Sequence, residues 1–107
     1  FLKGGGDIVL PKYYDFCKPS WHLFVIRTSR RDELLEYLHT NNIFAGIHYP
    51  IPIHKLGAYE ELETTETNLK NVELFSNQII SLPIYPELTS DNVEYICNKI
   101  REFYNSK

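Results

Sequence analysis

The nine residues from Gly46 to His54 constrain the fold of this 107-residue chain more than any other stretch. They read Gly-Ile-His-Tyr-Pro-Ile-Pro-Ile-His, with Pro50 and Pro52 at alternate positions. Proline fixes its own φ angle, removes an amide donor and disfavours helix at the residue before it. We therefore expect an extended, rigid segment that holds two imidazoles and a phenol, groups that exchange protons or donate hydrogen bonds near neutral pH.

Strand-like runs lie on both sides of this segment. Residues 22–28 are almost continuously apolar and β-favouring, which predicts a central strand covered on both faces. Residues 8–14 have the same bias but contain a proline, which is typical of an edge strand. Residues 43–47 predict a short strand that leads into the proline segment, and residues 81–86 a short extended exit.

Three helices are expected. The first begins near Ser29, has acidic residues close to its positive end, and stops at Asn41. A brief helical turn over 55–62 precedes a second helix that begins near Asn68. The third helix, capped by Thr89, has the clearest pattern. The apolar face of the second helix is expected to comprise Leu69, Val72, Phe75 and Ile79, and that of the third Val93, Ile96, Cys97, Ile100, Phe103 and Tyr104.

This order of elements predicts an α+β fold with a small, mainly antiparallel sheet and helices packed on one face. A ferredoxin-like arrangement would need more strands. Residues 8–107 are expected to form one domain. Residues 1–7 include three consecutive glycines and are expected to be a linker or the boundary of a piece of something longer.

Composition excludes several classes of partner. The net charge of −3 gives no basic surface for nucleic acid, and no apolar run approaches the length of a membrane span. Cys97 lies on the apolar stripe of the third helix, so a reduced, buried thiol is favoured over a disulfide with Cys17. The absence of a recognisable signal peptide favours a cytoplasmic location.

The histidines allow more than one interpretation. A metal site at His48 and His54 is disfavoured, because no further donor nearby completes a set of three or four ligands. Two other interpretations stay open. Either both rings face a polar ligand together with Tyr49, or one ring satisfies a buried backbone carbonyl while Tyr49 packs. His22 opens the central strand, where a structural histidine is the more common case. No arrangement typical of nucleophilic catalysis is present in the sequence.

Several sequence blocks, taken in order, resemble one family. They are Trp21–Arg27, Arg31–Leu34, Gly46–His54, Ala58-Tyr59 and Ser81–Thr89. Together they are similar to the C-terminal small domain of the DegT/DnrJ/EryC1/StrS aminotransferases, which are fold-type I enzymes that use pyridoxal phosphate to aminate nucleotide-linked keto-sugars. The resemblance runs from about residue 8 to residue 104, almost the whole chain.

The resemblance implies an amino-sugar biosynthetic enzyme that takes its amino group from glutamate and works as a homodimer, with polysaccharide or antibiotic as the end product. In such enzymes a large domain holds the cofactor on a lysine, and no segment here resembles that motif. The chain alone is therefore expected to be inactive, with its large domain missing. Some relatives dehydrate their substrate instead. The alternative is a non-catalytic module that binds a sugar nucleotide or another protein.

The resemblance also implies substrate-binding residues. His48 and Tyr49 are expected to contact the adduct of cofactor and sugar. His54 is expected to shape the same wall, and His22 matches a recurrent histidine of the family whose role is open. No metal ligand and no catalytic residue is assigned within this chain.

Overall fold

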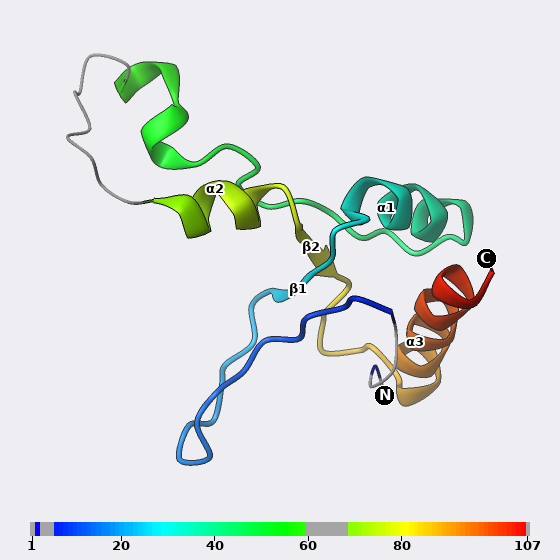
Figure 1. The fold of residues 1–107 in the computed structure, drawn as a ribbon. Coiled ribbons are helices and arrows are strands. Elements are labelled where there is room, and N and C mark those ends of the chain that lie inside the picture. The colour runs from blue at the N-terminus through cyan, green and yellow to red at the C-terminus, as the bar shows by residue number, and fades with distance from the viewer. Residues whose placement is uncertain (1, 3–5, 60–68, 107) are drawn as a thin grey trace.

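The computed structural model describes residues 2, 6–59 and 69–106 (Figure 1). Within these ranges, a two-stranded sheet lies at the centre, with three helices and two short 3-10 turns around it (Figure 1). The elements in chain order are β1 Phe24–Arg27, α1 Arg31–Thr40, η1 Ile53–Lys55, η2 Gly57–Tyr59, α2 Lys70–Ser76, β2 Ile79–Leu82 and α3 Ser90–Asn105.

The two strands are antiparallel, and Ile26 of β1 lies opposite Ile80 of β2. Single antiparallel bridges extend the sheet on both sides. Val9 pairs with Arg27 beside β1, and Gly46 pairs with Ser81 beside β2. Four segments of chain therefore lie side by side, and the predicted mainly antiparallel sheet is confirmed.

The strands are shorter than the sequence predicts. Residues 8–14 and 43–47 each contribute one bridge instead of a strand. Next to Val9, Pro11 offers no amide donor, which limits further pairing with β1. Beside β2, pairing stops at Gly46 as the chain enters the proline segment. β1 itself keeps only the centre of the predicted 22–28 run.

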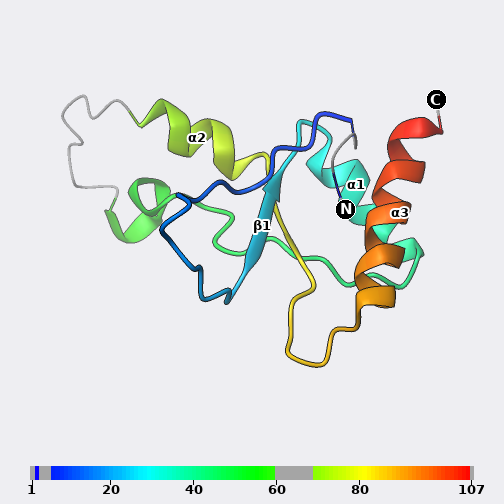
Figure 2. The ribbon, with the colours of Figure 1, turned by 90° about the horizontal axis from the view of Figure 1, so that it is seen from below.

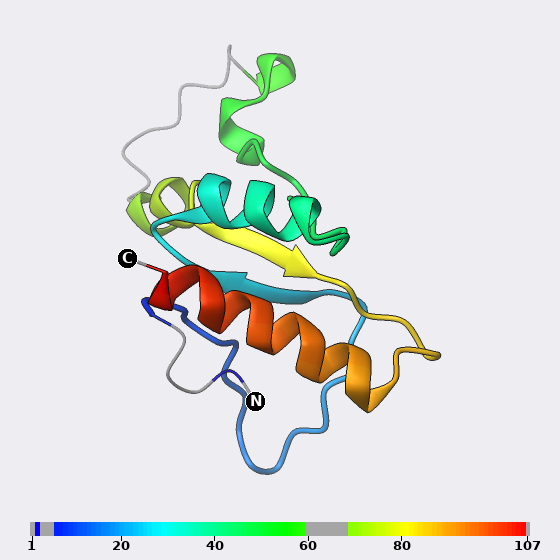
Figure 3. The same cartoon turned by 90° about the vertical axis from the view of Figure 1, so that its right-hand side faces the viewer.

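Helices α1 and α3 cover one face of the sheet, which we call the packed face (Figures 2 and 3). Because side chains alternate along a strand, Ile26 and Ile80 point to this face. They meet Leu34 and Leu38 of α1 and Ile100 of α3, and all five side chains are fully buried. The predicted α+β fold with helices packed on one face is therefore confirmed.

Helix α1 begins at Arg31, two residues later than the predicted start at Ser29. The Ser29 hydroxyl does not cap the helix, because it donates to Asp7 at 2.5 Å. Thr28 instead accepts a hydrogen bond from the Arg30 amide at 3.1 Å. The predicted end is confirmed, since Asn42 has a left-handed φ of 58°.

Helix α2 is short and none of its side chains is buried. The prediction that Ile79 belongs to its apolar face is wrong, because α2 ends at Ser76 and Ile79 begins β2. The predicted turn over 55–62 divides into η1 and η2, and residues 60–62 and Asn68 lie outside the described part of the chain. Together α2 and residues 48–59 form what we call the open side, which lies away from α1 and α3 (Figure 2).

Helix α3 agrees with the prediction. Thr89 caps it by accepting a hydrogen bond from the Asn92 amide at 3.3 Å. Cys97 is buried in the core, where burial raises the pKa of its thiol, and both it and the exposed Cys17 are unpaired.

Over residues 2, 6–59 and 69–106, no helix combines the length and the apolar character needed to cross a membrane.

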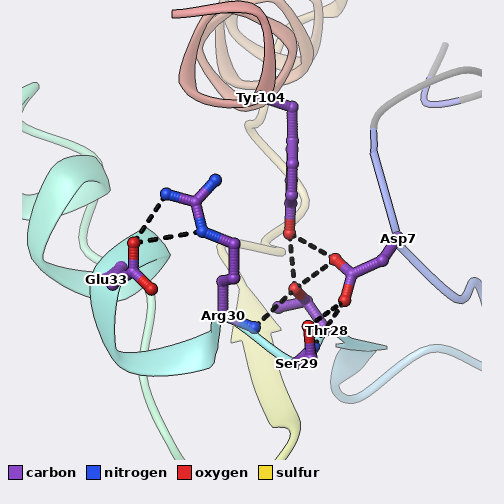
Figure 4. Close-up of polar contacts among 6 residues, drawn as sticks. All are labelled: Asp7, Thr28, Ser29, Arg30, Glu33 and Tyr104. Carbon is purple, nitrogen blue, oxygen red and sulfur yellow. Dashed lines mark hydrogen bonds and ion pairs between the residues drawn. The ribbon is translucent and has the colours of Figure 1, made fainter. Parts of the chain in front are cut away.

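A polar cluster ties the N-terminal segment to the packed face (Figure 4). The Asp7 carboxylate accepts hydrogen bonds from Thr28 at 2.6 Å, from the Ser29 amide at 2.7 Å and from the Tyr104 hydroxyl at 2.7 Å. Desolvation pushes the pKa of Asp7 upward, but these hydrogen bonds outweigh it and hold the pKa well below its usual range. Burial is the main cause that raises the pKa of Tyr104 to about 12.

Gly6 beside this cluster has no room for a side chain. Its φ is 59°, and a Cβ atom there would lie 2.1 Å from Cδ1 of Tyr104. Leu2, from the same predicted linker, is buried against the core. The domain boundary between residues 7 and 8 stays a prediction, but both Leu2 and Asp7 contact the domain.

Candidate functional site

The proline segment leaves the edge of the sheet from a fixed point. Gly46 and Ser81 exchange two backbone hydrogen bonds, of 3.0 Å and 2.7 Å. One residue earlier, the Ala45 carbonyl lies 2.7 Å from Nε2 of His39. The chain is therefore held by β2 and α1 at the point where it passes to the open side.

His48 lies two residues beyond this anchor, and its side chain is exposed. Its Nδ1 atom lies 2.9 Å from the Ser81 hydroxyl. Ser81 is only 5% exposed, because β2 turns its side chain away from the packed face and under the proline segment. One nitrogen of the ring is thus fixed by the sheet while the exposed ring retains a second nitrogen.

Tyr49 is the most unusual residue of the segment. Its side chain is 84% exposed, and its φ of 57° lies in the left-handed region. A non-glycine residue there costs about 1–2 kcal/mol, and such strain concentrates at functional sites. The prediction of a fully extended segment is therefore wrong at Tyr49. It is also wrong at η1, a 3-10 turn that contains His54.

His54 is held by α2. Its Nε2 atom lies 3.3 Å from the Glu73 carboxylate, and Nζ of Lys55 lies 3.1 Å from the same oxygen. The hydrogen bonds from Lys55 first, and from His54 second, lower the pKa of Glu73. This small cluster fastens the far end of the proline segment to the sequence-distant α2.

A shallow, mainly apolar groove runs between the proline segment and α2. It is bounded by Tyr49, Ile51, Pro52, Ile53, His54, Tyr59, Leu69 and Val72. Tyr49 and His54 therefore border one space, whereas His48 does not line it. The wall of His48, Tyr49 and His54 stays a prediction. Most of the apolar side chains here are exposed, in contrast to those of the packed face.

His22 lies apart from these residues. It is exposed and stands two residues before β1. Within the described ranges, its side chain makes no hydrogen bond and does not border the groove. Its assignment as a binding residue stays a prediction.

Two partners of the predicted site residues were missed by the sequence reasoning. Ser81 holds His48 from 33 positions away, and Glu73 holds His54 from 19 positions away. Ser81 belongs to one of the resembling blocks, but nothing in the sequence pairs that block with residue 48. Only the antiparallel bridge between Gly46 and Ser81 brings the two together.

The described part of the chain offers hydrogen-bonding groups but little reactive machinery. It contains no group of three or more His, Cys, Asp or Glu side chains placed to hold a metal ion. Its lysines lie at the surface: Lys12, Lys18, Lys55 and Lys70 are exposed, and the partly exposed Lys99 pairs with Glu102 at 2.7 Å. The arrangement is suited to binding and orienting an oxygen-rich ligand.

This fold is shared with DegT-family aminotransferases of known structure, one of them from Brucella abortus. The profile of the DegT/DnrJ/EryC1/StrS aminotransferase family matches residues 6–101, so the chain belongs to that family. It is 38% identical over 102 residues to the dTDP-3-amino-3,4,6-trideoxy-alpha-D-glucose transaminase of Streptomyces venezuelae. That match covers 95% of this chain and 27% of the transaminase.

A solved structure and a further sequence relative are also similar to this chain. The crystal structure of DesV from S. venezuelae, in complex with a ketimine intermediate, superimposes with a TM-score of 0.87 at 38% identity. This likeness covers 96% of our chain and 28% of DesV. A pleiotropic regulatory protein of Geobacillus stearothermophilus is 35% identical over 92% of this chain and 27% of its own length. The chain thus spans about a quarter of the relatives that it matches.

Enzymes of this family generally depend on pyridoxal phosphate. The described residues do not by themselves fit that cofactor, because their lysines are exposed at the surface or, like Lys99, paired with a carboxylate.

Proposed function

We propose that this chain is the small domain of an aminotransferase that converts a nucleotide-linked keto-sugar to an amino sugar, with glutamate as amino donor. The products of such a reaction serve polysaccharide or antibiotic synthesis. His48 and Tyr49 form one wall of the substrate site, and His54 shapes the groove beside them. The observation that carries the proposal is the exposure of His48 and Tyr49 on a segment anchored to the sheet, in a chain of this family.

The geometry supports binding in a definite way. A nucleotide sugar presents diphosphate oxygens and hydroxyl groups, which an imidazole N–H and a phenol recognise by hydrogen bonds. Both ends of the segment are held, by Ser81 at one end and by Glu73 at the other. Because the two imidazoles already have partners in the fold, ordering them for binding costs little conformational entropy.

A larger domain of the same protein, carrying pyridoxal phosphate on a lysine, completes the proposed site. We place the enzyme in the cytoplasm and expect a homodimer. Support comes from the relatives, of which this chain matches about a quarter. The large exposed side chains Phe16, Tyr49, Ile53 and Phe44, at 86%, 84%, 71% and 79% exposure, also favour coverage by more polypeptide.

Kinetics of the full-length protein test this proposal. Glutamate-dependent amination of a nucleotide-linked keto-sugar is measured for His48→Ala and Tyr49→Phe. Loss of a hydrogen bond to a charged ligand group should lower kcat/KM by roughly 10- to 100-fold for His48→Ala. Tyr95→Phe is the matched control, because its hydroxyl reaches the Asn41 carbonyl on the packed side.

Normal kinetics in both site variants would refute the assignment of this wall. The regulatory name of the Geobacillus relative favours one other function, a module that binds a sugar nucleotide or a protein without catalysis. Binding of the nucleotide sugar without any amino-sugar product would favour that module over the enzyme.

A further inference from the structure

We propose that Ser81 is a positioning residue: its buried hydroxyl donates a hydrogen bond to Nδ1 of His48 and thereby directs a protonated Nε2 toward the nucleotide sugar. This inference rests on the proposed function, because it assumes that His48 contacts the ligand. It adds a residue on β2 that touches the ligand only through the histidine.

The position of the Ser81 hydroxyl is set by the core. Its neighbours Ile80 and Leu82 are 0% and 7% exposed and point into the packed face. Because alternate residues of a strand face opposite sides, their burial turns Ser81 toward the proline segment. Pairing with Val25 of β1 on one side and with Gly46 on the other fixes its backbone.

The direction of the hydrogen bond follows from the partners available. A hydroxyl donates one hydrogen, and a buried donor rarely stays unpaired. Within the described residues, Nδ1 of His48 is the partner of the Ser81 hydroxyl, at 2.9 Å, and no buried side-chain donor or acceptor there is left without one. A lone pair on Nδ1 accepts this hydrogen, so in the neutral ring the proton resides on Nε2.

This tautomer matches the proposed ligand. Diphosphate oxygens accept hydrogen bonds and donate none, so the ring must present an N–H group to them. The exposed His48 ring, with Nδ1 already engaged, has Nε2 as its remaining nitrogen. Without the serine, the proton would be shared between the two nitrogens and the ring would rotate more freely.

A double-mutant cycle in the full-length protein tests the inference. Ser81→Ala should lower kcat/KM by about 3- to 10-fold, which corresponds to the net free energy of one ordinary hydrogen bond. Combining it with His48→Ala should cause no loss beyond that of His48→Ala alone, because the serine acts through the ring. Ser81→Thr retains the hydroxyl and should recover most of the activity, while the exposed Ser90→Ala serves as the control.

The possible failures are distinguishable. Normal kinetics for Ser81→Ala beside impaired kinetics for His48→Ala would overturn the inference and leave the proposed function intact. Losses that multiply in the double variant would also overturn it. If His48→Ala itself is normal, the proposed binding wall fails, and the inference fails with it.

A spectroscopic measurement covers the case in which Ser81→Ala does not fold. Nitrogen spectra of the wild-type protein with labelled histidine report which ring nitrogen of neutral His48 carries the proton. A proton on Nε2 supports the inference. A proton on Nδ1 overturns it.

Discussion

The packed face and the open side both carry large apolar side chains, but the packed face buries them and the open side leaves most of them exposed. On the packed face, Leu34, Leu38 and Ile100 are fully buried between the sheet and two helices. On the open side, Ile53 is 71% exposed and α2 buries no side chain. Because burial of apolar side chains is the main source of stability, the packed face holds the fold. The open side contributes little to this burial.

The two regions also use polar groups differently. At the packed face, the Asp7 carboxylate collects hydrogen bonds from Thr28, Ser29 and Tyr104 and closes the N-terminal segment onto the domain (Figure 4). On the open side, the contacts of His48 and His54 hold rings that remain next to solvent or to the groove. The first kind of contact stabilises the fold, and the second orients the imidazoles of the candidate site.

The largest expected difference between the regions concerns leucines. Leu38→Ala on the packed face should lower the free energy of unfolding by about 2–5 kcal/mol, because it leaves a cavity in the core. Leu74→Ala on the open side, where the leucine is 54% exposed, should change it by less than about 0.5 kcal/mol. Urea unfolding of the full-length variants measures both values, and equal losses would erase the contrast.

A smaller effect is expected at the polar cluster. Asp7→Asn should lower the free energy of unfolding by about 1 kcal/mol at neutral pH, a value that allows for the exposure of the carboxylate. The folded-state pKa of Asp7 is lowered, so its stabilisation is present above the ordinary pKa of about 4 and is lost as the pH falls further. The unfolding midpoints of the wild type and the variant should therefore converge as the pH is lowered from about 5 to about 2. A constant gap would contradict this account.

The smallest effect is expected at Glu73. Glu73→Gln removes the exposed charge that pairs with Lys55 and His54, and exposed ion pairs contribute little to stability. Thermal unfolding should show no measurable change in Tm. A decrease as large as that of Asp7→Asn would mean that the open side also holds the fold.

Prediction from sequence worked best where local pattern and burial agree. The period of Val93, Ile96 and Ile100 places α3 correctly, because a helix of that length buries the stripe that its sequence presents. It worked least well at Ile79, whose spacing fits the face of α2 but which belongs to β2. A short helix gains little from propensity, so pairing with β1 decides where the strand begins.

In the candidate site too, the sequence predicts some features and not others. The sequence marks His48, Tyr49 and His54 because of their residue types and the prolines between them. It gives no sign of the left-handed conformation of Tyr49, since that angle depends on how the chain turns after its bridge to Ser81. Local sequence patterns also do not predict partners that are distant in the sequence, such as Glu73.

The sequence alone therefore determined the class of fold, the third helix and the proline segment in which the candidate site lies. These depend on hydrophobic period and on proline geometry, which act over a few neighbouring residues. Tertiary structure decided which serine faces which imidazole and which apolar residues remain exposed. Those outcomes depend on the register of strands far apart in the chain, where a shift of one residue would turn Ser81 into the core and Ile80 toward His48.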